Sequence, residues 1–253
     1  MGHKMKTDSR RVNYVPATHV KTRPDSAELA ENYIREWDEK RLEVKKERPR
    51  PKMPPTICFS RKIGVGALEI ADILAEQTGY RVVDSEILEH IANQAKLSEK
   101  TVALFDERYP GQIGELLSFA FREKAFIKSD YTRHLFRTIL SIAGLGPTIF
   151  VGRGVHMLLP RERILAIRFI ASKEQRVKRL ADITDLDEKE AEKEIEKMDR
   201  EQSDFFKKVY KKKGASPYEF DLVINCEYLS DPKLAADIVA LAFKNKFGPE
   251  ARD

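Results

Sequence analysis

The sequence predicts an α/β domain in which a five-stranded parallel sheet carries helices on both faces. Five short apolar or β-branched segments alternate with helical ones, which is the pattern of parallel strands joined by helical crossovers. The segment at 164–170 is nearly all apolar, as expected for a strand that is buried on both faces. The five expected strands lie at 56–60, 80–83, 148–151, 164–170 and 222–225.

The segments between these strands have the sequence pattern of helices. The first, at 67–78, ends at Gly79, a residue that readily adopts the left-handed conformation found after a helix C-terminus. The last, at 231–247, follows Ser230, which we expect to be its N-terminal cap. The other expected helices lie at 85–95, 98–106, 173–183 and 187–212, with two more within 113–143.

Residues 1–55 are predicted to form a basic extension ahead of a domain at 56–253. The extension holds 14 Lys and Arg against 9 Asp and Glu, and the rest of the chain holds 32 of each, so the net charge of +5 lies in the extension. The polar stretch at 1–25 predicts disorder, a helix is expected from about 26 to 46, and the proline-rich run at 48–55 predicts a linker. The extension could pack on the domain or bind a protein partner. A nucleic-acid partner is not expected, because acidic residues dilute the basic ones.

Composition argues against several classes of protein. The chain has no run of 18 apolar residues and no apolar N-terminal stretch, so neither a membrane span nor a signal peptide is expected. Cys58 and Cys226 both lie in apolar runs, which predicts two buried, reduced thiols and a cytoplasmic protein. The five histidines are scattered along the chain, so no metal site is expected.

A glycine-containing turn follows the first expected strand and precedes a helix. Gly64 and Gly66 can adopt positive φ angles and let a ligand approach the backbone closely. The next helix directs its first N–H groups and its dipole at this turn, which favours an anion such as phosphate. Arg61 and Lys62 add positive charge there. Glycines also serve purely steric purposes in such turns, so the turn alone leaves a phosphate cradle and a plain tight turn both open.

Four segments, in this order along the chain, extend the pattern. They are Ser-Arg-x-x-Gly-x-Gly-x-x-Glu-Ile at 60–70, Ile-Phe-Val-Gly-Arg-Gly at 149–154, the strand at 167–171 with the arginine-bearing helix after it, and Asp-Leu-Val-Ile-Asn at 221–225. Together they resemble the cytidylate kinase-like family, a branch of the nucleoside monophosphate kinases, over about residues 56–245. The resemblance implies a P-loop-kinase-like fold with a helical lid at about 187–215.

The resemblance implies transfer of a phosphoryl group from ATP, which enters with Mg²⁺, to a nucleoside monophosphate of the CMP type. It places Arg153 against the acceptor phosphate, although the same residue could form a structural ion pair. It assigns Asp84 to the acceptor nucleotide or to a water on Mg²⁺, with capping of the next helix as the alternative. The residues that it implies around the donor nucleotide are Ser60, Arg61, Lys62, Gly64, Val65, Gly66 and Glu69.

The resemblance also implies that further arginines stabilise the transferred phosphoryl group. Arg176 and Arg179 share one helix face and are candidate phosphate clamps, and a solvated charged face is the alternative. Arg200, Lys207 and Lys208 lie where the family carries Arg or Lys in its lid. The catalytic candidates are therefore Arg153, Arg176, Arg179 and Arg200.

The chain departs from the family at the turn itself. An ordinary P-loop ends in Gly-Lys-Ser/Thr, and the family has an arginine beside its glycines, but this chain has Ala67 and Leu68 there, followed by Glu69. The loss of such a cation from a dry site costs about 3 kcal/mol of transition-state stabilisation. The lid also has Gln202 where the family tends to carry arginine.

Two functions therefore remain open from the sequence. One is an active nucleotide kinase in which Arg61, Lys62 or distant arginines replace the missing cation. The other is a non-catalytic nucleotide-binding protein, a pseudo-kinase that acts as a sensor or scaffold and uses residues 1–55 to reach a partner.

Overall fold

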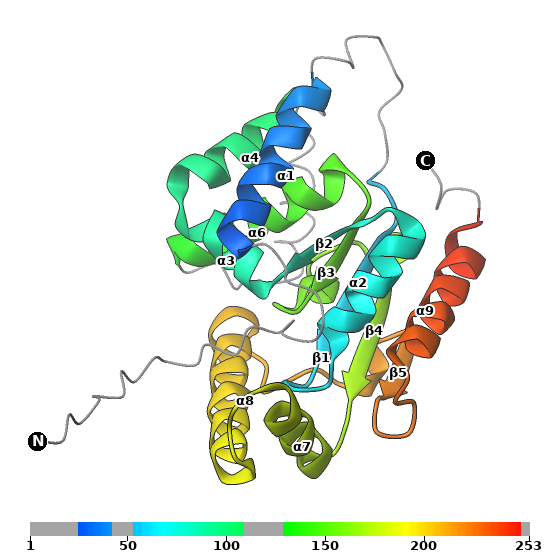
Figure 1. Ribbon diagram of the computed structural model, residues 1–253. Helices are drawn as coiled ribbons and strands as arrows, with labels where there is room; N and C mark the ends of the chain where they lie inside the picture. The colour runs from blue at the N-terminus through cyan, green and yellow to red at the C-terminus, as the bar shows by residue number, and fades with distance from the viewer. Residues whose placement is uncertain (1–24, 42–52, 109–128, 249–253) are drawn as a thin grey trace, which may run out of the picture.

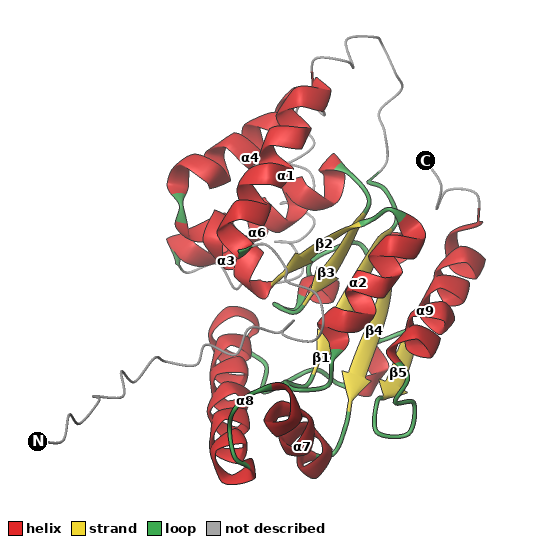
Figure 2. Cartoon of the chain, viewed as in Figure 1, coloured by secondary structure: helices red, strands yellow, loops and turns green. Residues whose placement is uncertain are grey.

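The computed structural model of the protein describes residues 25–41, 53–108 and 129–248 (Figures 1 and 2). Within these residues, five strands form one sheet in the order β2-β3-β1-β4-β5, and every neighbouring pair is parallel. This arrangement confirms the predicted α/β fold. The strands are β1 (Thr56–Arg61), β2 (Arg81–Asp84), β3 (Thr148–Val151), β4 (Ile164–Ile170) and β5 (Leu222–Asn225).

Both faces of the sheet are covered by helices, and the alternation of side chains along β1 separates the two cores. Ile57 and Phe59 belong to one apolar cluster, whereas Cys58 belongs to the other. Figure 2 shows the two layers. The first cluster packs under α2 (Ala67–Thr78) and α9 (Pro232–Phe247), and the second under α3 (Ser85–Asn93), α4 (Ala95–Arg108) and α6 (Asp130–Leu145).

Two helices form a pair beyond the end of the sheet toward which the arrow of β4 points (Figure 1). They are α7 (Lys173–Ile183) and α8 (Glu188–Tyr210), and only α8 lies within the predicted lid at about 187–215. α8 begins with a capping box, in which Asp187 and Glu190 each accept a hydrogen bond from the other residue's backbone N–H. Ile63 of the turn after β1 packs with Leu180 and Ile195 in a small core, so the pair is anchored on the turn.

The helix expected in the N-terminal extension is α1 (Ser26–Arg41), and it packs on α3 and α4. Ala30, Ile34 and Trp37 lie on one face of it and are almost fully buried. The hydroxyl of Tyr33 donates to the backbone carbonyl of Val82 in the edge strand β2, at 3.2 Å. α1 is therefore part of the packed structure, and residues 1–24 and 42–52 lie outside the described residues.

Helix ends follow the predictions in part. Gly79 caps α2 with a φ of 72°, and its N–H donates to Ala75 O at 2.8 Å, as expected. α9 begins one residue later than predicted, and its cap is Asp231 rather than Ser230, because the Asp231 carboxylate accepts from the Lys233 N–H. The predicted helical segment at 113–128 lies outside the described residues. None of the helices that the structure describes is long and apolar enough to cross a membrane.

The strand order decides where a ligand can bind. The chain leaves β1 toward one edge of the sheet, to β2, and leaves β3 toward the other edge, to β4. The connections after β1 and β3 therefore diverge at the carboxyl ends of adjacent strands, where open α/β sheets have their binding crevices.

Candidate functional site

The turn between β1 and α2 requires glycine at both predicted positions. Gly64 has a φ of 86° and Gly66 a φ of 77°, in the left-handed region that disfavours other residues. A Cβ atom at Gly64 would stand 3.0 Å from Ile195 Cδ1 and 3.2 Å from Arg176 O. The backbone of this turn is thus packed closely beneath α7 and α8.

The N-terminus of α2 opens onto the turn without a side-chain cap. Gly66 occupies the cap position and has no side chain that could accept a hydrogen bond from the first N–H groups of α2. Ala67 and Leu68 are buried in the apolar core under α2 and α9, with 2% and 3% of their surface exposed. Neither side chain therefore fills the turn. Free N–H groups at a helix N-terminus, together with its dipole, are suited to an anion.

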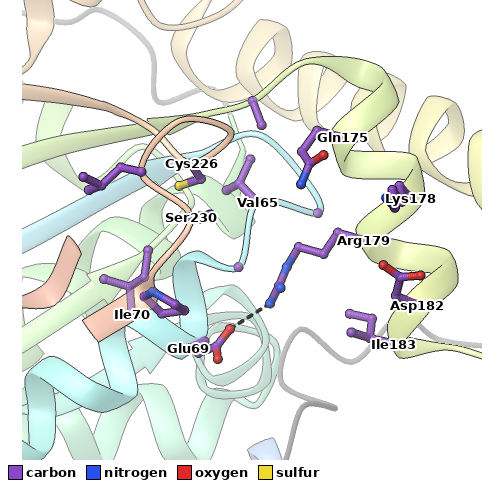
Figure 3. Close-up of a pocket in the computed structure, with 15 residues that line it drawn as sticks. Val65, Glu69, Ile70, Gln175, Lys178, Arg179, Asp182, Ile183, Cys226 and Ser230 are labelled. Carbon is purple, nitrogen blue, oxygen red and sulfur yellow. Dashed lines mark hydrogen bonds and ion pairs between the residues drawn. The ribbon is translucent and has the colours of Figure 1, made fainter. Parts of the chain in front are cut away.

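Arg179 of α7 brings positive charge to this turn. A Cβ atom at Gly66 would stand 2.8 Å from Arg179 Nη2, so the guanidinium lies directly against the glycine. Arg179 Nη2 also donates to Glu69 Oε2 at 2.8 Å, across the mouth of the turn (Figure 3). Its Nε atom is buried and finds no hydrogen-bond partner among the described residues. This N–H is a buried donor without a partner in the described part of the chain, and it lies next to Gly66 in a turn that already favours negative charge.

A cavity of about 290 Å³ opens beside Arg179, between α7 and the connection from β5 to α9. Figure 3 shows Gln175, Lys178 and Arg179 on one side and Cys226 and Ser230 on the other. Burial raises the pKa of the Cys226 thiol to about 11. The residues that line the cavity are Gly64, Val65, Gly66, Glu69, Ile70, Ala171, Gln175, Lys178, Arg179, Asp182, Ile183, Cys226, Leu229, Ser230 and Pro232.

Arg176 is buried under the turn and supports its shape. Its side chain is 6% exposed, and Nη1 donates to Ile63 O at 3.2 Å and to Asp199 Oδ2 at 2.9 Å. The charge is therefore held between the backbone of the turn and α8. In this conformation Arg176 stabilises the turn, and Arg179 is the arginine that faces the cavity.

Arg153 lies after β3, on the other side of the crevice. Its Nε stands 3.0 Å from Glu89 Oε1 of α3, and its guanidinium lies 4.5 Å from the centre of the Phe205 ring of α8. Glu89 also accepts a hydrogen bond of 2.6 Å from the hydroxyl of Tyr131. The Arg153 side chain is 27% exposed, so solvent still reaches part of it.

Most residues of this site lie in a segment that matches a known family. The model of the cytidylate kinase-like family matches residues 56–228. The chain belongs to the cytidylate kinase-like family. The match covers the turn, both arginine-bearing segments and the α7–α8 pair, and it ends before α9. No curated protein matches the chain significantly.

A solved structure shares the fold of this chain. An uncharacterized protein from Eubacterium ventriosum superposes with a TM-score of 0.59 and 20% identity, over 77% of this chain and 99% of that one. A shikimate kinase from Bacteroides thetaiotaomicron has a TM-score of 0.39 and 12% identity, over 75% and 98%. A Thermus thermophilus protein has a TM-score of 0.40 and 16% identity, over 76% and 98%. At 20% identity, the likeness to the Eubacterium ventriosum protein concerns the fold alone.

Two residues predicted for this kinase-like site have structural partners. Asp84 is 4% exposed and caps α3, where its Oδ1 accepts from the N–H groups of Glu86 and Ile87 at 3.0 Å each. The observed contacts of Asp84 are therefore those of a helix cap, the alternative that the sequence left open. Arg200 is 69% exposed on α8, with Nη1 at 3.9 Å from Glu196.

The first residues of the turn are held by the fold. Ser60 Oγ accepts from Arg168 Nη1 of β4 at 2.6 Å. The backbone carbonyl of Arg61 accepts from Gln202 of α8 at 3.3 Å, and the Lys62 N–H donates to Phe169 O at 3.1 Å. The Arg61 side chain is 8% exposed.

The charge of Arg61 also acts on Glu86, in the first turn of α3. Burial raises the pKa of Glu86, the nearby Asp84 charge adds to this increase, and Arg61 opposes it. Val65 is the predicted turn residue that, with the two glycines and Glu69, lines the cavity.

Sequence reasoning missed several groups around Arg153 and the turn. Glu89, Tyr131 and Phe205 carry no motif, and their grouping depends on how α3, α6 and α8 pack. Arg168 lies in an apolar strand, where burial lowers its pKa and its side chain bonds to Ser60. For Asp84, the Asp-Ser sequence before a helix was the available signal for a cap.

Proposed function

We propose that this protein transfers a phosphoryl group from ATP, bound as its Mg²⁺ complex, to a nucleoside monophosphate of the CMP type. The contact between Arg179 and Gly66 carries the proposal, because it puts a guanidinium at the open N-terminus of α2. The loop cation missing at Ala67 and Leu68 is thus supplied from α7. The turn, with its departure from the usual sequence, serves as the phosphate cradle.

The chemistry asked of these residues is positioning and charge neutralisation. In phosphoryl transfer, negative charge spreads over the oxygens of the transferred group, and fixed cations stabilise it. Donor phosphates at the turn would accept from the first N–H groups of α2 and from the unpartnered Nε–H of Arg179. Glu69, at 2.8 Å from Nη2, occupies one other donor of Arg179 until a phosphate oxygen replaces it.

Mg²⁺ enters this proposal as part of the donor substrate. The described residues include no group of three His, Cys, Asp or Glu able to hold a metal alone. Mg²⁺ commonly keeps several waters and binds phosphate oxygens together with one or two carboxylates. Glu69 and Asp182 both line the cavity, and Glu69 is the one in the first turn of α2, next to the turn after β1.

The acceptor is assigned to the crevice at Arg153. The partly exposed guanidinium would meet the monophosphate, with Glu89 as the resident counterion that the phosphate displaces. The thiols of Cys58 and Cys226 are both free, which is consistent with the cytoplasm as the compartment.

A second candidate is non-catalytic nucleotide binding. The observation that favours it is that Arg153, Arg176 and Arg179 each form an ion pair with a carboxylate, at 3.0, 2.9 and 2.8 Å. A site neutralised in this way could hold a nucleotide without transfer. Residues 1–55, of which the described part packs through α1, would then provide a surface for a partner.

Calorimetry with ATP and Mg²⁺, then with CMP, dCMP and UMP, followed by a diphosphate assay on the same sample, separates these functions. We expect ATP and one monophosphate to bind and a diphosphate to form. Binding of both nucleotides without product would replace the kinase proposal by the binding one. The absence of any binding would exclude both.

A further inference from the structure

The backbone at Arg153 is held in an unfavourable conformation. Gly152, Arg153 and Gly154 have consecutive positive φ angles of 98°, 51° and 68°. A left-handed conformation is uncommon for arginine and persists where the surrounding structure enforces it. Some neighbouring contact must therefore fix the orientation in which Arg153 leaves β3.

Tyr210, the last residue of α8, makes that contact. Its hydroxyl donates to the backbone carbonyl of Arg153 at 2.6 Å. Its ring fills the space beside Gly154, where a Cβ atom would stand 2.6 Å from Tyr210 Cε2. The ring is 2% exposed and stacks on Phe136 with centroids 5.8 Å apart, so the hydroxyl is held in place. Burial raises the pKa of Tyr210, which keeps the hydroxyl protonated as a donor.

The guanidinium of Arg153 is oriented from two further sides. The Phe205 ring lies 4.5 Å below it, in the geometry of a cation–π contact. Glu89 stands 3.0 Å away and is itself fixed by the 2.6 Å hydrogen bond from Tyr131. Phe205 and Tyr210 lie five residues apart at the same end of α8.

We propose that Tyr210 and Phe205 are positioning residues that hold Arg153 in the orientation required for the acceptor phosphate. The orientation itself is independent of function, whereas the acceptor phosphate rests on the proposed function. The middle of α8 contacts the donor side, through Asp199 to Arg176 and through Gln202 to the carbonyl of Arg61. One continuous helix thus sets both the donor turn and the acceptor arginine.

The test uses Tyr210→Phe, which removes only the hydroxyl, and Phe205→Leu, which removes the aromatic face. In the ligand-free protein, ¹⁵N relaxation of arginine Nε–H groups, assigned with Arg153→Lys, should show a rigid Arg153 in the wild type and a mobile one in both variants. Matched controls are Tyr80→Phe and Phe243→Leu, which alter a buried tyrosine and a buried phenylalanine in the other core. Both controls should leave Arg153 rigid.

The second measurement compares the two substrates. We expect Tyr210→Phe and Phe205→Leu to raise KM for the monophosphate about 5- to 10-fold while KM for ATP changes less than about 2-fold, the scale of one lost hydrogen bond. A rigid Arg153 in both variants, or equal changes in both KM values, would overturn the positioning role. If the wild type binds no monophosphate, the proposed function fails, and the relaxation data alone decide whether α8 orients Arg153.

Discussion

The guanidinium of Arg179 lies against Gly66, close enough that a Cβ atom on the glycine would stand 2.8 Å from Nη2. This contact joins α7 to the start of α2 and puts a cation beside Ala67 and Leu68, which supply none. It also explains why Gly66 is required beyond its positive φ angle. The two residues can be tested separately and together.

Gly66→Ala should displace Arg179 as well as strain the backbone. The φ of 77° costs alanine about 1–2 kcal/mol of stability, and the guanidinium must move to make room. Gly79→Ala is the matched control, because it has a φ of 72° but nothing within 4 Å of the new Cβ. We expect similar losses in urea unfolding, but weaker ATP binding only for Gly66→Ala. Equal ATP affinity in both variants would show that Arg179 does not serve the turn.

Arg179→Met should weaken triphosphate binding about 10- to 100-fold, because hydrogen bonds to a charged group are lost. Lys178→Met is the control for charge, since Lys178 lines the same cavity from the same helix. Calorimetry with ATP should show the large loss only for Arg179→Met, while adenosine, which has no phosphates, should bind both variants equally. Equal losses with ATP and adenosine would indicate collapse of the cavity instead.

The sequence sufficed for the fold but not for the contacts between distant elements. An apolar segment such as 164–170 predicts a strand of a buried parallel sheet, and Gly64 and Gly66 predict a turn with positive φ angles. The sequence predicts these two features because each depends on a local pattern. The approach of Arg179 to Gly66 depends on the packing of α7 beside α2, which no local pattern encodes. The same holds for Glu89 and Tyr210 around Arg153, which meet across three elements.

The reactivity of the Cys226 thiol should show whether a ligand occupies the cavity. It is half-buried at the lining, whereas Cys58 is 1% exposed, so a maleimide should modify Cys226 alone in the folded protein. Burial raises its pKa to about 11, and the thiolate is the reactive form. The rate should therefore keep rising about tenfold per pH unit up to pH 10. ATP should slow it, as followed by peptide mass spectrometry. Modification of Cys58 at the same rate would contradict this.

Asp221 should make stability depend on acidic pH. Burial opposes its ionisation, but hydrogen bonds from Arg161, the Ala166 N–H and Lys246 outweigh burial and lower its pKa. A lowered folded-state pKa gives stability that is present above the unfolded value of about 3.9 and is lost as pH falls through the folded one.

Asp221→Asn is the variant that tests this dependence. We expect it to cost about 1–2 kcal/mol in urea unfolding at pH 7 and progressively less below pH 4. Asp204 is exposed, so Asp204→Asn serves as the control and should change the free energy of unfolding little. A constant difference between Asp221→Asn and the wild type from pH 7 to pH 2 would contradict the assigned pKa direction.

Trp37→Ala tests whether α1 belongs to the same cooperative unit as the sheet, although it lies outside the residues matched by the family model. Trp37 is 5% exposed in the core over α3 and α4, and Arg81 of β2 lies 5.6 Å from its ring. Truncation of a buried tryptophan costs about 3–5 kcal/mol, so the single unfolding transition should move as a whole. Tyr218 is 98% exposed, so Tyr218→Ala should leave the unfolding transition where it is in the wild type. A separate early transition in Trp37→Ala would instead mean that α1 unfolds on its own, since loss of its packing would then leave the sheet intact.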